Sequence, residues 1–109
     1  MRHISFSPAP EYLAKLQLAI QEAHGCQAEH EATWMGVEHL GPLLWSGSVE
    51  VFRLQGEAPA RRAFAWSKVE GQHLHCYVVL EDEAVTSPRE AVRHVLSEQC
   101  AELEPAHLA

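Results

Sequence analysis

Apolar positions near both ends of the chain recur every three or four residues, the spacing of one face of an α-helix. The first stripe ends before Gly25, and the second lies between Ser87 and Pro105. Glycine ends helices readily because it adopts the left-handed conformation, and proline cannot continue a helix. The pattern predicts two amphipathic helices, whose buried faces are Leu13, Leu16, Ile20 and Ala23, and Val92, Val95, Leu96, Gln99 and Leu103.

Both predicted helices have recognisable first turns. Ser7 can cap the first helix, and Pro8 suits its first position because the N–H that proline lacks is not needed there. The second opens with Ser87-Pro88-Arg89-Glu90, a capping box in which serine and glutamate satisfy free backbone N–H groups reciprocally. We expect this helix to run to about Glu104.

Between the helices the apolar period changes to two, the period of a β-strand with one buried face. Residues 36–47 contain Gly41-Pro42 and are predicted to form a loop that packs down through its leucines and Trp45. Two segments of four residues, 56–59 and 68–71, are typical of hairpin loops. The strands are expected at 26–34, 48–55, 60–67 and 72–80. The chain is therefore predicted to be one α+β domain over residues 1–109, with an antiparallel sheet of three to four strands in the order α-β-β-β-β-α.

The loop lengths predict which side chains share a face of the sheet. Four-residue loops pair Ser67 with Gln72 and Gln55 with Ala60, and side chains alternate along each strand. One face then collects Phe52, Leu54, Ala63, Ala65, Leu74, Cys76, Val78 and Leu80. The other collects Val49, Val51, Arg53, Arg62, Phe64, Trp66, His73, His75, Tyr77 and Val79. We assign both helices to the first face, where the two alanines allow close approach.

The second face is rich in aromatic and basic residues, which is unusual for a surface exposed to water. Such residues are enriched at the centres of protein interfaces. We expect a second copy of the chain to cover this face. The alternative is that the 36–47 loop covers it within one chain, through Trp34 and Trp45. The candidate interface or ligand residues are Arg53, Arg62, Phe64, Trp66, His73, His75 and Tyr77.

Composition and charge narrow the function classes. Hydrophobic residues make up 47% of the 109 residues and the formal net charge is −7. An acidic chain cannot displace counterions from phosphates, so binding to nucleic acids or to anionic membranes is not expected. No segment has the length of a signal peptide core or a membrane span. Three distant cysteines predict reduced thiols and a cytoplasmic location: Cys26, Cys76 and Cys100.

Two clusters could carry chemistry. His73 and His75 point the same way on one strand, as pairs of metal ligands do, but a catalytic zinc needs a third ligand. The candidates for that ligand are His30, Glu29 and Glu31. Arg53 and Arg62 are predicted to face each other beside Tyr77, so they form either an anion-binding spot or ion pairs with Glu29, Glu31, Glu50 or a partner chain.

No sequence pattern indicates a catalytic nucleophile or a cofactor. His75 and Cys76 are neighbours in sequence but point to opposite faces, so they cannot form a catalytic dyad. Glycine-rich phosphate-binding motifs and the H-E-x-x-H zinc motif are absent from the sequence. We therefore expect a protein that is not an enzyme and that holds no cofactor.

Two resemblances bear on this reading. Val49-Glu50-Val51-Phe52 followed by Ala63-Phe64-Ala65-Trp66-Ser67 resembles small uncharacterised bacterial proteins of mobile gene pools, a resemblance that implies no activity. The order of elements resembles that of the double-stranded RNA-binding domain. That family carries a lysine cluster at the start of its last helix, where this chain has Ser87-Pro88-Arg89-Glu90-Ala91.

Three functional hypotheses follow from the sequence. The first is an interaction module that forms a homodimer through the aromatic face. The second is a protein that binds a small cationic or aromatic ligand in a pocket walled by Trp34, Trp45, Trp66 and Tyr77. The third is a metal-dependent enzyme that uses His73 and His75.

Overall fold

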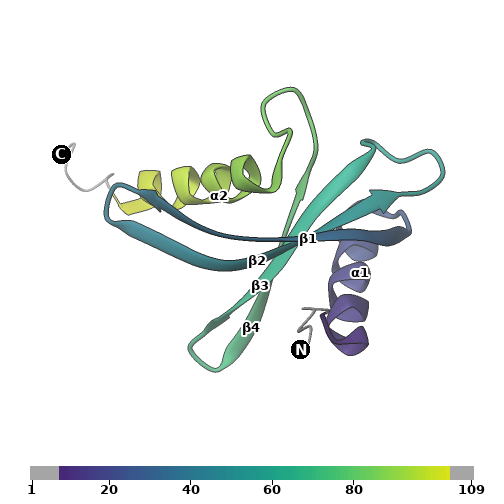
Figure 1. The fold of residues 1–109 in the computed structure, drawn as a ribbon, viewed down its shortest axis with the longest axis horizontal. Helices are drawn as coiled ribbons and strands as arrows, with labels where there is room; N and C mark the ends of the chain where they lie inside the picture. The colour runs from purple at the N-terminus through teal and green to yellow at the C-terminus, as the bar shows by residue number, and fades with distance from the viewer. Residues whose placement is uncertain (1–7, 104–109) are drawn as a thin grey trace, which may run out of the picture.

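The fold has two helices and one four-stranded antiparallel sheet (Figure 1). The computed structural model describes residues 8–103. The elements are α1 (Pro10–His24), β1 (Ala28–Leu40), β2 (Leu43–Leu54), β3 (Arg62–Glu70), β4 (His73–Leu80) and α2 (Pro88–Leu103). The predicted α+β class and element order are confirmed. No helix within residues 8–103 combines the length and apolar character needed to cross a bilayer.

Helix α1 begins two residues later than predicted. Pro10 is its first residue and Ala9 is the N-cap, without a side-chain hydrogen bond. The predicted cap, Ser7, lies outside the described residues. The end is as predicted, since Gly25 takes a left-handed φ of 70° and its N–H bonds to the Gln21 carbonyl at 2.8 Å.

The capping box at the start of α2 is confirmed, with one additional residue. The Glu90 N–H donates to Ser87 Oγ at 3.2 Å. In return, the Glu90 carboxylate accepts from both the backbone N–H and the hydroxyl of Thr86. These bonds from Thr86, and then one from Ser87, hold the pKa of Glu90 below its usual value. The predicted stop at Pro105 lies outside the described residues.

We predict that this cap makes stability depend on pH. The folded-state pKa of Glu90 is lowered, so its contribution is present above the unfolded value of about 4.3 and is lost as the pH falls through the folded value. Glu90→Gln should therefore lower the free energy of unfolding at pH 7, and its difference from the native chain should vanish in acid. Urea denaturation across that range measures this. The control is Glu83→Gln, at an exposed position, and an equal difference at both ends of the range would contradict the prediction.

Residues 36–47 are not a loop, and that prediction is wrong. β1 and β2 continue to a two-residue turn at Gly41-Pro42, with Leu40 paired to Leu43. Gly36 and Gly47 suggested a loop but pair with each other inside the hairpin. Any side chain at Gly36 would collide with the Trp34 ring, so this glycine makes room for a tryptophan.

The β3–β4 loop is also shorter than predicted. The turn is Gly71-Gln72, so Ser67 pairs with Cys76 and not with Gln72. This shifts the pairing by four residues. Because an even shift keeps every side chain on its face, the two predicted faces survive the error. The β2–β3 register is as predicted, with Arg53 opposite Arg62.

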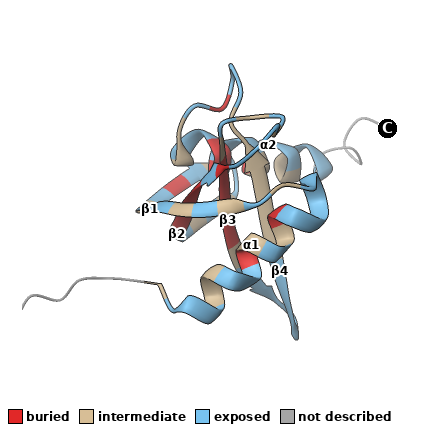
Figure 2. Ribbon diagram, turned by 90° about the vertical axis from the view of Figure 1, so that its right-hand side faces the viewer, coloured by how far each residue is buried: buried red, intermediate tan, exposed pale blue. Residues whose placement is uncertain are grey.

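The helices lie on opposite faces of the sheet, so the prediction that both share one face is wrong (Figure 1). α1 packs through Leu16 and Ile20 on the face of Ala63 and Ala65. α2 covers the aromatic face, where its buried residues are Ala91, Val92 and Leu96. Figure 2 shows buried positions on the strands and on the inner sides of both helices. The second face is apolar because it belongs to a second core.

A short seam joins the two hairpins. β2 and β3 pair through only four residue pairs, Glu50 to Arg53 against Arg62 to Ala65. Beyond that seam the β1–β2 and β3–β4 hairpins run in different directions (Figure 1). One more backbone hydrogen bond lies beside the seam, from the Leu54 N–H to the Arg61 carbonyl at 2.9 Å. Further out, side chains must hold the hairpins together.

Candidate functional site

A row of aromatic rings crosses the α2 face of the sheet, one ring from each strand. Trp34 stacks on Trp45 with ring centroids 6.1 Å apart, and Trp45 meets Trp66 edge-on at 6.2 Å. Trp66 stacks on Tyr77 at 5.5 Å. The Trp45–Trp66 contact joins the two hairpins beyond their short seam. Aromatic pairs in such geometries add about 0.5–1.5 kcal/mol each beyond the area they bury.

The centre of this face is buried within the chain, so it is not open for a second copy. Phe64 is 0% and Trp66 is 2% exposed. Helix α2 of the same chain covers both. The alternative was that residues 36–47, with Trp34 and Trp45, cover this face. It is correct in part, because both tryptophans pack against this core from the β1–β2 hairpin.

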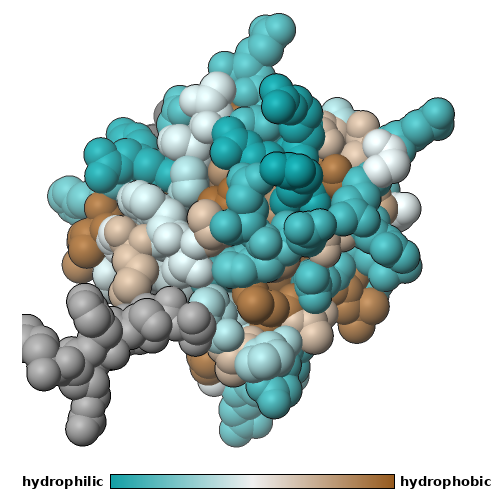
Figure 3. Space-filling view, turned by 45° about the vertical axis from the view of Figure 1, so that its right-hand side comes forward, coloured by the Kyte–Doolittle hydropathy of each residue, from teal (hydrophilic) through white to brown (hydrophobic). Residues whose placement is uncertain are grey.

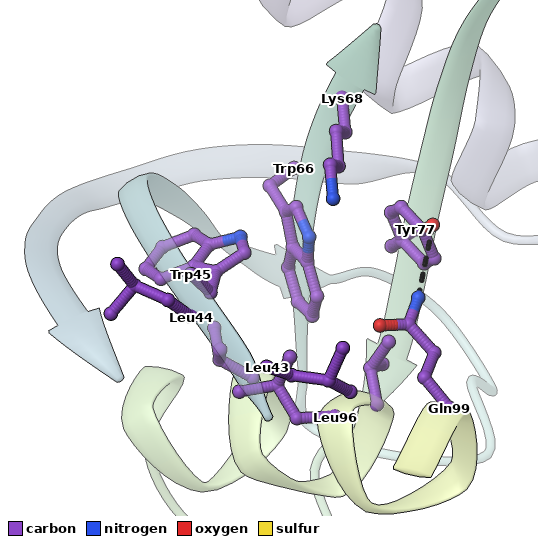
Figure 4. A pocket seen from close by; sticks show the side chains of 10 residues that line it. Leu43, Leu44, Trp45, Trp66, Lys68, Tyr77, Leu96 and Gln99 are labelled. Carbon is purple, nitrogen blue, oxygen red and sulfur yellow. Dashed lines mark hydrogen bonds between the residues drawn. The ribbon is translucent and has the colours of Figure 1, made fainter. Parts of the chain in front are cut away.

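The pocket predicted among the aromatic residues is nearly filled (Figure 4). Trp45, Trp66 and Tyr77 line a cavity of about 30 Å³ together with residues of α2. One water molecule occupies about 30 Å³ of liquid, so this space is too small for an aromatic ligand. Gln99 Nε2 donates to Tyr77 Oη at 3.4 Å, and the Tyr77 hydroxyl donates to Glu70 at 3.0 Å. Burial, and then the Glu70 carboxylate, raise the pKa of Tyr77.

The paired arginines are neutralised by acids of the same chain. Glu31 lies 3.4 Å from Arg53 and 3.7 Å from Arg62, and Glu81 contacts Arg62 at 2.6 Å. The Glu81 hydrogen bond raises the pKa of Arg62. Of the two alternatives for the arginines, the structure shows ion pairs within the chain. These pairs leave little net positive charge to bind an anion. Tyr77 does not lie beside Arg62, because it pairs with Trp66.

The predicted metal ligands do not gather at one place. His73 and His75 lie exposed near the tip of the β3–β4 hairpin, with His75 Nδ1 3.9 Å from Glu70. The proposed third ligands, His30, Glu29 and Glu31, lie on β1, at the opposite edge of the sheet. Within residues 8–103 no three His, Cys, Asp or Glu side chains are grouped to hold a metal ion. Cys26, Cys76 and Cys100 are free thiols.

The outer edge of β4 is the first of two features that the sequence reasoning missed. The Glu81 N–H donates to the Arg62 carbonyl at 2.9 Å, which extends the β3–β4 ladder by one pair. Backbone groups alternate in direction along an antiparallel strand, so odd-numbered residues of β4 face β3. The N–H and C=O groups that face outward belong to Leu74, Cys76, Val78 and Leu80.

This edge lacks the devices that usually protect an exposed strand. Charges, prolines and bulges prevent edge strands from pairing with other chains. β1 has a bulge between His30 and Ala32 and several glutamates. β4 reads HLHCYVVL, with no bulge, proline, lysine or acid. An open groove of about 720 Å³ runs between this edge and α2. Acids and histidines border it: Glu70, Asp82, Glu98, Glu102, His24, His75 and His94.

Glu50 is the second missed feature. It lies on β2 at one end of the seam and is 0% exposed. Its Oε1 accepts from Thr33 Oγ1 at 2.5 Å and from His30 Nε2 at 2.8 Å. Because a carboxylate oxygen can only accept, Nε2 of His30 carries the proton. Among residues 8–103, Glu50 Oε2 is buried and has no hydrogen-bond partner. The signal was present in the sequence, because Glu50, Phe52 and Leu54 are two residues apart and therefore share the face assigned to the helices.

Comparisons with known proteins identified no relative of this chain. We found no family model, no curated protein and no solved structure that matches it.

Proposed function

We propose that this chain is a non-enzymatic interaction module that forms a homodimer by pairing the β4 edges of two copies. The observation that carries the proposal is the regular, unprotected outer edge of β4. The distribution of exposed apolar side chains also favours association through a strand edge rather than through a broad face. On the side shown in Figure 3, apolar side chains lie in separate small patches among hydrophilic ones. A large docking face would instead be continuous.

One antiparallel register satisfies all the free backbone groups of the edge. It places Tyr77 on the twofold axis, so that Leu74 pairs with Leu80 of the second copy and Cys76 with Val78. In this register His73 lies directly across from Glu81 of the second copy. Aromatic residues paired across strands stabilise a sheet, and an imidazole N–H can donate to a carboxylate. The resulting eight-stranded sheet would keep both copies of α2 on one side.

The charge of the chain opposes self-association. Two copies, each with a formal net charge of −7, repel each other, and their acidic groove walls would lie close together. The dimer should therefore strengthen with salt, because the repulsion is screened over shorter distances. Three free thiols support the proposal that the chain works in a reducing compartment such as the cytoplasm.

We expect Leu74→Pro to weaken the dimer at least tenfold. Proline removes an outward N–H, and its ring blocks the approach of a second strand. The fold of one chain should survive, because the Leu74 N–H does not bond to β3 and its side chain is 44% exposed. Sedimentation equilibrium at low and high salt measures the dissociation constant.

Leu74→Ala is the matched control, since it shortens the same side chain and keeps the N–H. It should weaken the dimer much less than Leu74→Pro does. A native chain that stays monomeric at high micromolar concentration and high salt would overturn the proposal. Equal effects of the two substitutions would show that the side chain, and not the strand edge, makes the interface.

A further inference from the structure

Glu50 is buried at a high energetic cost that the described residues do not fully offset. A buried carboxylate oxygen without a donor loses the hydrogen bonds that water would give it, at a cost of several times the thermal energy. Its two donors, Thr33 and His30, both bond to Oε1. The arginines of the neighbouring positions on β2 and β3, Arg53 and Arg62, lie on the other face of the sheet and bond to Glu31 and Glu81. Oε2 is therefore left without a donor among the described residues.

Glu50 also lines a cavity on the α1 side of the sheet. It measures about 290 Å³ and is lined by Glu50, Thr33, Met35, Ser48 and Tyr12, with Pro8 at its rim and Gly47 beside it. The lining is mainly apolar. Met35 is 57% exposed. The cavity is near the lower end of the volume range of small-molecule sites.

We infer that this cavity binds a small ligand with a primary ammonium group on an apolar body, with the ammonium donating to Glu50 Oε2. An ammonium is a compact charge with three rotatable N–H donors, so one of them can point to a single carboxylate oxygen while the others bond elsewhere. A guanidinium binds best to both oxygens of a carboxylate, and here Oε1 already accepts two hydrogen bonds. The Ser48 hydroxyl offers a second acceptor, and the Tyr12 ring offers an aromatic face to the cation.

A metal ion fits this site less well than an amine. One carboxylate and one histidine are too few ligands for a structural or catalytic zinc ion. His30 also uses Nε2 to donate to Glu50, so that nitrogen is not free to ligate. The site lies on the α1 face of β2, away from the outer edge of β4, so it does not depend on the proposed dimer.

Titration with hexylammonium tests this inference, with hexan-1-ol as the uncharged probe of equal chain length. In amide NMR spectra, hexylammonium should shift the resonances of Thr33, Met35 and Ser48. Glu50→Gln should weaken the binding of hexylammonium at least tenfold and leave that of hexan-1-ol unchanged. Equal affinity of the two probes for the native chain would overturn the inference, as would equal affinity of hexylammonium for the native and substituted chains. Shifts confined to the acidic groove beside β4 would also overturn it.

A second substitution tests the same site by filling it from within. Met35 and Glu50 are diagonal neighbours across the β1–β2 pair, within reach of a long side chain. Met35→Lys should therefore block hexylammonium binding and raise the melting temperature. Met35→Gln, which adds no charge, is the matched control and should do neither. If Met35→Lys bound hexylammonium as the native chain does and melted no higher than Met35→Gln, Oε2 would not be the acceptor.

Discussion

Trp66→Ala is expected to lower the free energy of unfolding by about 3–5 kcal/mol, the range for removing a large buried aromatic side chain. Trp66 is 2% exposed, and its ring contacts both Trp45 and Tyr77. Its loss opens a cavity under α2 and also removes the bridge between the two diverging hairpins. Since the free energy of unfolding of a small domain is only about 5–15 kcal/mol in total, much of the stability should be lost. Urea denaturation followed by far-ultraviolet circular dichroism measures the change.

Trp34→Ala provides the comparison for this result. Trp34 lies at the outer end of the same aromatic row and is half-buried, so its removal should lower the free energy of unfolding clearly less. The two substitutions remove the same side chain from one row. If Trp66→Ala left stability within about 1 kcal/mol of the native value and instead changed the oligomeric state, the aromatic face would be an interface after all.

Glu50→Gln is expected to raise the free energy of unfolding of the ligand-free chain by about 1–2 kcal/mol, since a neutral amide loses less on burial than a charge. The amide oxygen can still accept from Thr33 and His30. A substitution that stabilises the fold and abolishes ligand binding is typical of a functional site, where activity and stability oppose each other. Thermal and urea unfolding without added amine measure the change.

Glu38→Gln is the matched control, because Glu38 is the other buried glutamate of the described residues. It is 8% exposed, and its oxygens pair separately with Arg89 at 3.0 Å and Arg93 at 3.1 Å. Removing that charge leaves two arginines without their partner, so this substitution should destabilise the chain by about 1 kcal/mol. The same change should thus have opposite signs at the two sites. Destabilisation at both would mean that Glu50 Oε2 is satisfied in solution.

Alternation along the strands was enough to predict which side chains share a face of the sheet. The β3–β4 turn was predicted too long, yet Tyr77 still fell on the face of Trp66, and Val78 on that of Ala65, because the error was an even number of residues. Alternation could not show which face each helix covers. Both faces carry apolar rows, and the stripe of a helix shows that it packs but not on which side of the sheet.

Glycine misled the prediction for a physical reason. Gly36 and Gly47 are typical turn residues, but here they lie paired within a hairpin, and Gly36 leaves space for the Trp34 ring. Such a close approach depends on residues that are neighbours only in the folded chain. The ammonium site was missed for a similar reason. Glu50 was expected only as one possible ion-pair partner of the two arginines, and only the structure shows that both of its donors bind one oxygen.

The short seam between β2 and β3 has a consequence for how the chain folds. Cutting the chain at the seam's loop would give two halves, each with one hairpin and one helix. Helix α1 of the first half contacts β3 and β4 of the second, and α2 of the second half lies over β1 and β2 of the first. The hairpin of each half is therefore covered by the helix of the other half, and neither half can complete its core alone. Folding must wait for contacts between distant parts of the sequence, which makes it slower and more cooperative than the two local hairpins suggest.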